Sequence, residues 1–254
     1  MNIVVGSDNG LIKICNLQTK QVVSSFGSIT SSIQNELQTM SFGWDNNETQ
    51  MLQGFKGGAF KHWQLQEDGT GHVVSECTYD SAIRAIRPLS EQRLLIATEK
   101  GTINVVKVSE DGVDMKQLDT LSFSKSLFAL KVNPSDESKV VIGGKECDLA
   151  ICDINTKQLT WRAKNAPPDK LRVSPPIWIT DMEYTPTDHN RIVTGTGHYQ
   201  IRLYDCRKNR TPPILDLTVT KHPILSIKMS SQFENSVFAS DSVGNVFAYD
   251  LRNG

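Results

Sequence analysis

One pattern of fifteen residues recurs six times along this chain, and such a repeat restricts the fold more than any single motif does. The first two positions of the pattern are apolar in every copy, and successive copies begin 43 to 52 residues apart. A period of this length is typical of proteins in which each repeat is one supersecondary unit that buries its apolar face against its neighbours. The copies are residues 3–17, 51–65, 94–108, 140–154, 192–206 and 237–251.

Small residues at fixed positions predict that each copy is a β-hairpin. The fourth position is always small, as a strand requires where another backbone or a large side chain comes close: Gly6, Gly54, Ala97, Gly143, Gly195 and Ser240. The eighth position is glycine in four copies, where a reversal between strands favours positive φ: Gly10, Gly58, Gly101 and Gly244. The last three copies end with an aspartate at the fourteenth position: Asp153, Asp205 and Asp250. With Cys152, Tyr204 and Tyr249 before them, these endings are altered forms of the Trp-Asp pair of β-propeller blades.

Segments of alternating apolar and polar residues between the hairpins predict the other strands of four-stranded blades. Five precede a hairpin and are expected to be inner strands: 37–42, 82–86, 127–132, 178–184 and 224–229. Four follow a hairpin and are expected to be outer strands: 22–26, 72–77, 158–162 and 214–219. We therefore expect an all-β WD-repeat propeller, one domain over residues 1–254, with roughly 22 strands in about six repeats. Because the first hairpin has no strand before it and the last has none after it, we also expect an open or incomplete ring that lacks the last blade.

The composition argues against several classes of protein. Lys and Arg total 27 against 28 Asp and Glu, so the formal net charge of −1 requires neither a nucleic acid nor a membrane as partner. No apolar run approaches the roughly 20 residues of a membrane span, and no secretory signal follows Met1. The five cysteines are an odd number and are expected to be reduced thiols in the cytosol or nucleus. Residues 123–254 carry the basic excess, so a polyanion-facing surface is expected there.

Catalytic and metal-binding patterns are largely missing from the sequence. No nucleophile elbow, phosphate loop or dinucleotide fingerprint occurs, and the five histidines are dispersed. Asp181 and Glu183 share one face of an expected inner strand, but an isolated pair of this sort is usually structural. The aspartates at the fourteenth position are likewise expected to accept hydrogen bonds at turns. We predict that the chain is not an enzyme and has no cofactor, no metal site, no small-molecule substrate and no membrane partner.

A basic cluster is the better candidate for function. Residues 162–178 contain four prolines, four basic residues and one acid, and residues 206–213 form a second basic, proline-terminated connection. Loops of this kind on a rigid scaffold often carry binding residues. The basic residues expected to converge are Arg162, Lys164, Lys170, Arg172, Arg207, Lys208 and Arg210. Arginines could bind phosphate or carboxylate while Trp178, His198 or Tyr199 stacks on a base; the alternative is a solvated loop.

Residues 140–215 resemble the nucleolar WD-repeat proteins that act in assembly of the large ribosomal subunit precursor. The resemblance lies in GGKECDLAICDI (143–154), WRAKN (161–165), LRVSPPIWITDMEY (171–184) and TGTGHYQIRLYD (194–205). It implies a non-enzymatic protein of the nucleus and nucleolus that binds assembly factors and precursor particles and is released with help from an AAA-type ATPase. It leaves contact with rRNA open. It marks these residues: Lys145, Arg162, Lys164, Asn165, Arg172, Trp178, His198, Tyr199, Gln200, Arg202 and Tyr204.

Some features depart from this family. His198 precedes Tyr199 where the usual order is reversed, and Pro167 and Pro168 occupy the loop. Family members are also implied to have a seventh blade and a lysine-rich C-terminal tail, which this sequence does not contain. The leading hypothesis is a non-catalytic scaffold of large-subunit assembly. The alternatives are a generic WD-repeat adaptor, such as a substrate receptor of a ubiquitin ligase, and a propeller hydrolase.

Overall fold

The computed structural model describes residues 2–27, 29, 31–45, 47–66, 69–168, 172 and 174–252. Within them the chain forms 22 strands and one short 3-10 turn, η1 (Ile33–Asn35). The strands make six antiparallel sheets, each with its strands in chain order, and these sheets fall into two compact units, residues 1–123 and 124–254. The fold class is thus the predicted one, an all-β propeller built from six blades. Residues 82–160 are all described and contain no helix.

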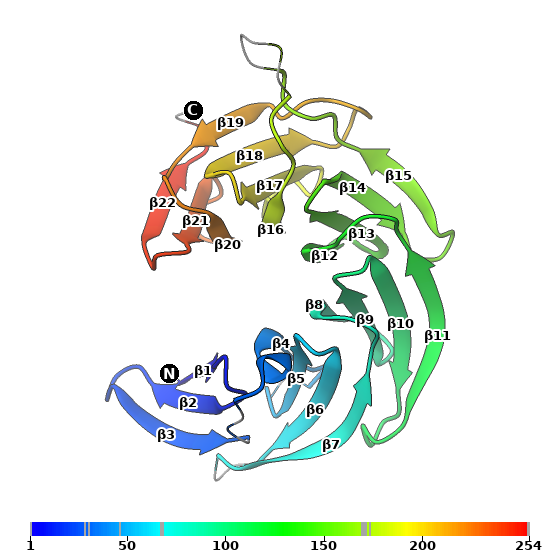
Figure 1. Ribbon diagram of the computed structural model, residues 1–254, viewed down its shortest axis with the longest axis vertical. Coiled ribbons are helices and arrows are strands. Elements are labelled where there is room, and N and C mark those ends of the chain that lie inside the picture. Colours follow the sequence, from blue (N-terminus) through cyan, green and yellow to red (C-terminus); the bar gives the residue numbers. More distant parts are fainter. Residues whose placement is uncertain are drawn as a thin grey trace. The chain divides into compact units, whose positions relative to one another are not determined.

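Unit 1 contains the first three blades (Figure 1). The first blade has three strands: β1 (Asn2–Gly6), β2 (Ile12–Asn16) and β3 (Gln21–Phe26). The second has four: β4 (Leu37–Phe42), β5 (Gln50–Phe55), β6 (Ala59–Leu65) and β7 (Gly71–Thr78). The third has β8 (Ile83–Pro88), β9 (Arg93–Thr98), β10 (Thr102–Val108) and β11 (Met115–Ser122). The sequence reasoning missed the outer strand β11.

Unit 2 contains the other three blades. The fourth blade has β12 (Ala129–Asn133), β13 (Asp136–Gly144), β14 (Cys147–Asp153) and β15 (Gln158–Arg162). The fifth has β16 (Ile179–Tyr184), β17 (Arg191–Thr196), β18 (Gln200–Asp205) and β19 (Leu215–Thr218). The sixth has three strands: β20 (Ile224–Met229), β21 (Ser236–Asp241) and β22 (Val246–Asp250). The open ring and the single domain stay predictions.

The six predicted hairpins have one common register, which confirms the repeat. In each, the residue at the first position of the pattern lies opposite the residue at the thirteenth. The pairs are Ile3–Cys15, Met51–Trp63, Leu94–Val106, Val140–Cys152, Ile192–Tyr204 and Val237–Tyr249. The same cross-strand neighbours therefore recur from blade to blade, and their side chains form equivalent parts of the packing between blades.

The small residue at the fourth position makes room for the following blade, as predicted. A Cβ atom on Gly54 would lie 2.5 Å from Cγ2 of Ile83, the first residue of β8. The same close approach occurs for Gly6 with Leu37, Gly143 with Ile179 and Gly195 with Ile224. The glycines at the eighth position also have the expected positive φ, between 86° and 95°. In the fifth copy that position is Tyr199, which takes a φ of 75° despite its side chain.

Aspartates within the blades accept hydrogen bonds at turns and between blades, which is the structural role predicted for them. Oδ1 of Asp153 accepts hydrogen bonds from the backbone N–H groups of Asn155 and Thr156 at the turn after β14. Asp205 and Asp250 bond the turns after β18 and β22 in the same way. Asp181 accepts from the backbone N–H of Ile227 at 2.9 Å, across the contact between β16 and β20. These carboxylates stabilise turns and blade contacts.

Glu183, the second member of the pair on β16, lies between two lysines. Its Oε2 is 3.1 Å from Nζ of Lys131 and 2.9 Å from Nζ of Lys228, on the inner strands of the neighbouring blades. Burial alone would raise the pKa of Glu183, but the two ammonium groups outweigh it and lower the pKa. The carboxylate therefore stays ionised and links three inner strands.

Candidate functional site

Hydrogen bonds hold the two basic connections of unit 2 side by side. The backbone N–H of Lys164 donates to the carbonyl of Thr211, and that of Arg210 donates to the carbonyl of Arg162, both at 2.9 Å. Nε1 of Trp161 donates to the carbonyl of Lys208 at 2.7 Å. The end of β15 in the fourth blade is thereby joined to the β18–β19 connection of the fifth.

A hollow of about 590 Å³ lies at this junction, and we call it the basic groove. It is lined by Asp148, Arg162, Ala163, Lys164, Asn165, Ile177 and Arg210. Three of these side chains are cationic and one is acidic, so the lining has a net positive charge. Nε of Arg162 donates to Oδ2 of Asp148 at 3.0 Å, yet 53% of the Arg162 side chain remains exposed. Lys164 and Arg210 are also exposed.

The aromatic part of the site combines the β13–β14 turn of the fourth blade with the entry to β16 and the β17–β18 turn of the fifth. We call it the aromatic corner: Lys145, Trp178, His198 and Tyr199. Lys145 and Trp178 form an isolated antiparallel bridge, and the ammonium of Lys145 lies 5.7 Å from the centre of the Trp178 ring. The rings of Trp178 and His198 meet edge to face with centroids 5.7 Å apart. The backbone N–H of Glu146 donates to the carbonyl of Ile177, a residue of the basic groove. The groove and the corner are therefore adjacent along the chain and joined by this bond.

The surroundings of His198 in the aromatic corner favour the neutral form of its imidazole. Burial, followed by the positive charges of Arg202 and Lys145, lowers the pKa of His198 below 6.5. Nε1 of Trp178 is buried and has no hydrogen-bond partner among the described residues. Tyr199 is 39% exposed. The corner therefore presents a cation and aromatic rings, a combination that can hold a planar or anionic group.

Several marked residues have structural contacts. Arg202 is only 3% exposed, its Nε lies 3.2 Å from Oδ2 of Asp216, and its guanidinium donates to Gln200. Asn165 bonds backbone groups at both ends of its amide, donating to the carbonyl of Pro175 and accepting from the N–H of Ala166.

The other basic side chains of the predicted cluster differ in their availability. Arg207 forms ion pairs with Asp188 and Asp205. Arg172 is exposed, with a φ of 61°. Lys170 lies outside the described residues. Arg207 nevertheless has 50% of its side chain exposed, and Lys208 is exposed as well. The exposed cations of this region therefore include Arg207, Lys208, Arg172 and Lys145 besides those of the basic groove.

Asp148 was not predicted as part of the groove, and Ile177 was predicted only as a member of the 162–178 loop. Asp148 lies on β14, and its pairing with Arg162 depends on the register of β14 against β15, where Ala150 lies opposite Arg162. A bulge in this pair shifts the register, and no local pattern in the sequence marks the bulge. Arg210 was in the predicted basic cluster but not among the residues that the family resemblance marks.

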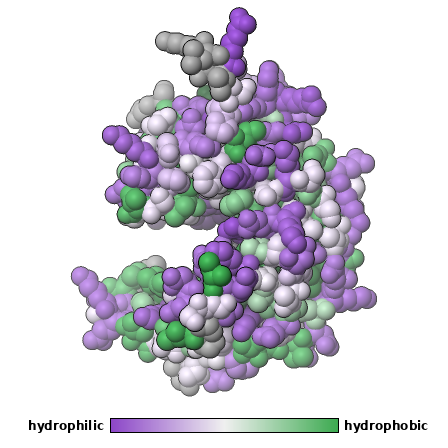
Figure 2. Space-filling view, in the orientation of Figure 1, coloured by the Kyte–Doolittle hydropathy of each residue, from purple (hydrophilic) through white to green (hydrophobic). Residues whose placement is uncertain are grey.

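Three further findings concern the hydropathy of the surface, metal ligands and membrane-spanning helices. In the face that Figure 2 shows, hydrophobic residues are scattered spots among hydrophilic ones. Within the described ranges, no three His, Cys, Asp or Glu side chains gather closely enough to hold a metal ion. Those residues also contain no helix long and apolar enough to cross a membrane.

The repeated hairpins, their common register and the Asp-bonded turns define the class of protein: a propeller with blades of the WD-repeat type. No family model matches the chain. It is 30% identical to a WD repeat-containing protein of Dictyostelium discoideum, over 99% of this chain and 56% of that protein. It is 27% identical to human WD repeat-containing protein 74, over 98% of this chain and 64% of that protein. It is also 25% identical to ribosome biogenesis protein NSA1 of Meyerozyma guilliermondii, over 62% of this chain and 42% of that protein. The chain thus spans between about half and two thirds of the length of the first two relatives.

Proposed function

We propose that this protein is a non-catalytic scaffold in biogenesis of the large ribosomal subunit, and that it acts in the nucleus and nucleolus. The names of similar proteins support the process, since the chain resembles a ribosome biogenesis protein over 62% of its length. On this proposal its partners are assembly factors and the precursor particle, and an AAA-type ATPase releases it.

The observation that carries the proposal is the meeting of the basic groove with the aromatic corner. Three exposed cations around a hollow favour an anionic partner, because guanidinium groups bind carboxylates and phosphates in pairs of hydrogen bonds. Lys145 and the exposed Tyr199 extend this surface with a charge and a ring. On the proposal, Arg162, Lys164 and Arg210 contact the partner directly, while Asn165 and Arg202 maintain the shape of the surface.

The test uses the full chain, tagged and expressed in cells, with Arg162, Lys164 and Arg210 all replaced by Ala. Each exposed replacement should change stability by only about 0.5 kcal/mol or less, so the variant should fold normally. Its co-sedimentation with large-subunit precursors should nevertheless fall severalfold. A matched control replaces three exposed lysines of unit 1 with Ala: Lys20, Lys107 and Lys116. The control removes the same charge and should sediment as the unaltered chain does.

Three outcomes would contradict the proposal. Unchanged sedimentation with an unchanged thermal melt would exclude the groove as a docking site. A large drop in melting temperature would mean that the three side chains maintain the fold. Co-purification with ubiquitin-ligase subunits in place of ribosomal precursors would favour the adaptor function instead.

A further inference from the structure

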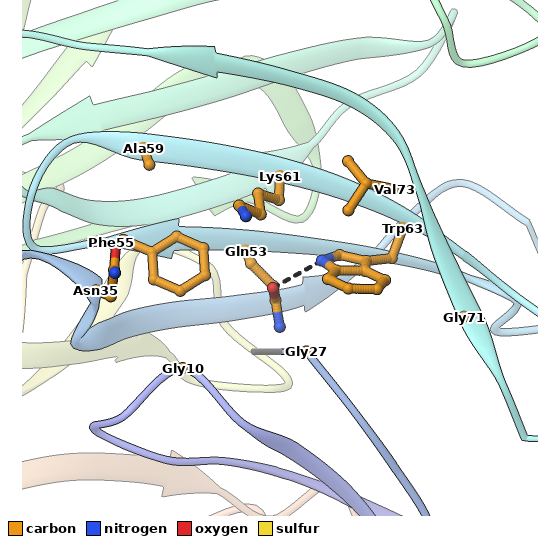
Figure 3. Close-up of a pocket in the computed structure, with 10 residues that line it drawn as sticks. All are labelled: Gly10, Gly27, Asn35, Gln53, Phe55, Ala59, Lys61, Trp63, Gly71 and Val73. Carbon is orange, nitrogen blue, oxygen red and sulfur yellow. Dashed lines mark hydrogen bonds between the residues drawn. The ribbon is translucent and has the colours of Figure 1, made fainter. Parts of the chain in front are cut away.

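A second cavity lies in unit 1, between the first and second blades, and has a volume of about 330 Å³ (Figure 3). One wall is the face of the second blade, where alternate residues point the same way: Gln53 and Phe55 on β5, Ala59, Lys61 and Trp63 on β6, and Val73 on β7. The opposite wall includes Gly10 and Gly27 of the first blade. Trp63 also belongs to an apolar cluster with Met51 and Ile12, which holds the two blades together beside the cavity. We call this cavity the interblade pocket.

Gln53 places an unused hydrogen-bond donor in the interblade pocket. The side chain is only 1% exposed, and its Oε1 accepts a hydrogen bond from Nε1 of Trp63 at 2.8 Å. Since an indole N–H can only donate, that bond fixes which end of the amide is oxygen and which is nitrogen. Nε2 of Gln53 is the other end, and it has no partner within the described residues. An unpaired buried donor of this kind destabilises the fold, and an acceptor that reached it would remove that cost.

A cation lies next to this donor. Lys61 is directly opposite Gln53 in the β5–β6 register, and Figure 3 shows its ammonium end turned toward Phe55. The ammonium is 5.9 Å from the centre of the Phe55 ring. Lys61 forms an ion pair with Glu76 at 3.6 Å, and the Glu76 side chain is 64% exposed, so solvent screens that pair. Lys61 therefore keeps N–H donors available for a further anion.

The fifth blade provides an internal comparison. There the equivalent positions are Thr194 and Arg202, again directly opposite each other. Arg202 has a side chain that is only 4% exposed, and its Nε lies 3.2 Å from Asp216. The cation of the fifth blade is thus buried and paired, whereas Lys61 has 32% of its side chain exposed beside a cavity. The cation of the second blade is therefore available for a ligand, and that of the fifth blade is not.

We propose that the interblade pocket binds the carboxylate of an acidic side chain, supplied by an extended segment of a protein partner. Gln53 and Lys61 would each donate to the carboxylate, while Phe55, Trp63 and Val73 would pack against the methylene groups. One water occupies about 30 Å³, so a single water does not account for the size of the cavity, which is at the lower end of the range for ligand pockets. The pocket has room for one side chain and two kinds of donor: the amide of Gln53 requires an acceptor, and the ammonium of Lys61 favours one with negative charge. This proposal does not depend on a role in ribosome assembly.

The test is a titration of the isotopically labelled full chain, followed by NMR of the side-chain N–H groups of Gln53 and Trp63. The probes are the peptide acetyl-Ala-Ala-Glu-Ala-Ala-amide and the same peptide with Gln in place of Glu. The acidic peptide should shift both signals in a saturable way, and the neutral one should not. Trp63→Phe identifies the indole signal among the four tryptophans.

Two variants keep the result interpretable. Lys61→Met removes the cation but keeps the apolar stem, and it should weaken binding of the acidic peptide about tenfold. Gln53→Glu keeps an acceptor for Trp63 but replaces the donor with an oxygen, so it should abolish binding while the chain stays folded. The matched control is Lys116→Met, on the exposed part of β11, which should bind as the unaltered chain does.

Several outcomes would overturn the inference. Equal shifts with the Gln peptide would show that charge is not recognised, and no shift with either peptide would show that the pocket does not bind an acidic side chain. Unchanged binding by Lys61→Met would exclude the cation. Binding of free glutarate with no binding of the acidic peptide would mean that the ligand is a small carboxylate and not a protein segment.

Discussion

Gly197 controls the position of Trp178, and replacing it with Ala is the sharpest test of the aromatic corner. A Cβ atom on Gly197 would lie 2.3 Å from Cδ2 and Cε3 of the Trp178 ring. Ordinary contacts begin at 3.4 Å, so the ring would have to move by about 1 Å (3.4 − 2.3 = 1.1). Gly197 does not have positive φ, so the expected effect is steric and not a strain on the backbone.

The size of the effect follows from how deeply the ring is held. Overpacking a well-filled site costs about 1–3 kcal/mol, and Trp178 is only half-buried, so the lower part of that range applies. A cost of 1–2 kcal/mol corresponds to a melting temperature lower by about 2–8 °C in a chain of this size. The displaced Trp178 ring would also lose its contacts with the ammonium of Lys145 and the ring of His198, so association with ribosomal precursors should weaken.

The assay is a double-mutant cycle measured by circular dichroism during thermal unfolding, with Trp178→Ala as the second change. Without the ring, Gly197→Ala should no longer destabilise, and it should stabilise by about 0.5 kcal/mol because alanine restricts the unfolded chain. The sign of the Gly197→Ala effect is therefore expected to reverse between the two backgrounds. An equal destabilisation in both backgrounds would refute the steric explanation.

Two further predictions concern the same corner. Tyr199→Gly should leave stability unchanged or raise it by up to about 1 kcal/mol, since glycine adopts the φ of 75° without strain. The same change should weaken co-sedimentation with ribosomal precursors. A loss of stability with unchanged co-sedimentation would contradict a binding role for the Tyr199 ring. The pKa of His198 is lower in the folded chain than in the unfolded chain, so below pH 6.5 the unfolded chain binds a proton more readily. The stability that depends on a neutral His198 should therefore be present above pH 6.5 and be lost as the pH falls below it. The unaltered chain should therefore lose more stability than His198→Asn between about pH 8 and pH 5.5 in chemical unfolding, and parallel losses would count against it.

Most of the fold could be predicted because each strand requires small or apolar residues at fixed positions, and these positions recur in every repeat. A small residue such as Gly54 or Gly195 is required where the next blade comes close, so this contact can be predicted from the sequence. The predicted inner strands 37–42 and 224–229 coincide with β4 and β20. The outer strand β11 was missed because outer strands lie at the edge of the blade and their residues are mostly exposed, so the alternation is weaker.

The candidate site could be predicted only in part. The composition of residues 162–178 marks a basic loop, but whether a given side chain is available depends on contacts between strands. Arg202 and Arg162 look equivalent in the sequence, yet the first is buried against Asp216 and the second is half exposed beside Asp148. The interblade pocket was missed altogether, because it arises where two glycines of one blade face an alternating pattern of another, which no local motif records.

The junction that forms the basic groove has a thermodynamic consequence. Its walls come from the end of β15 and from the β18–β19 connection, so the groove exists only while the fourth and fifth blades are docked. Any ligand that binds the groove must therefore shift the equilibrium toward the docked state by mass action. At a free ligand concentration one hundred times the dissociation constant, the gain is about 2.7 kcal/mol. A partner that occupies the groove would thus act as a clamp on unit 2, and its departure would leave that unit easier to open.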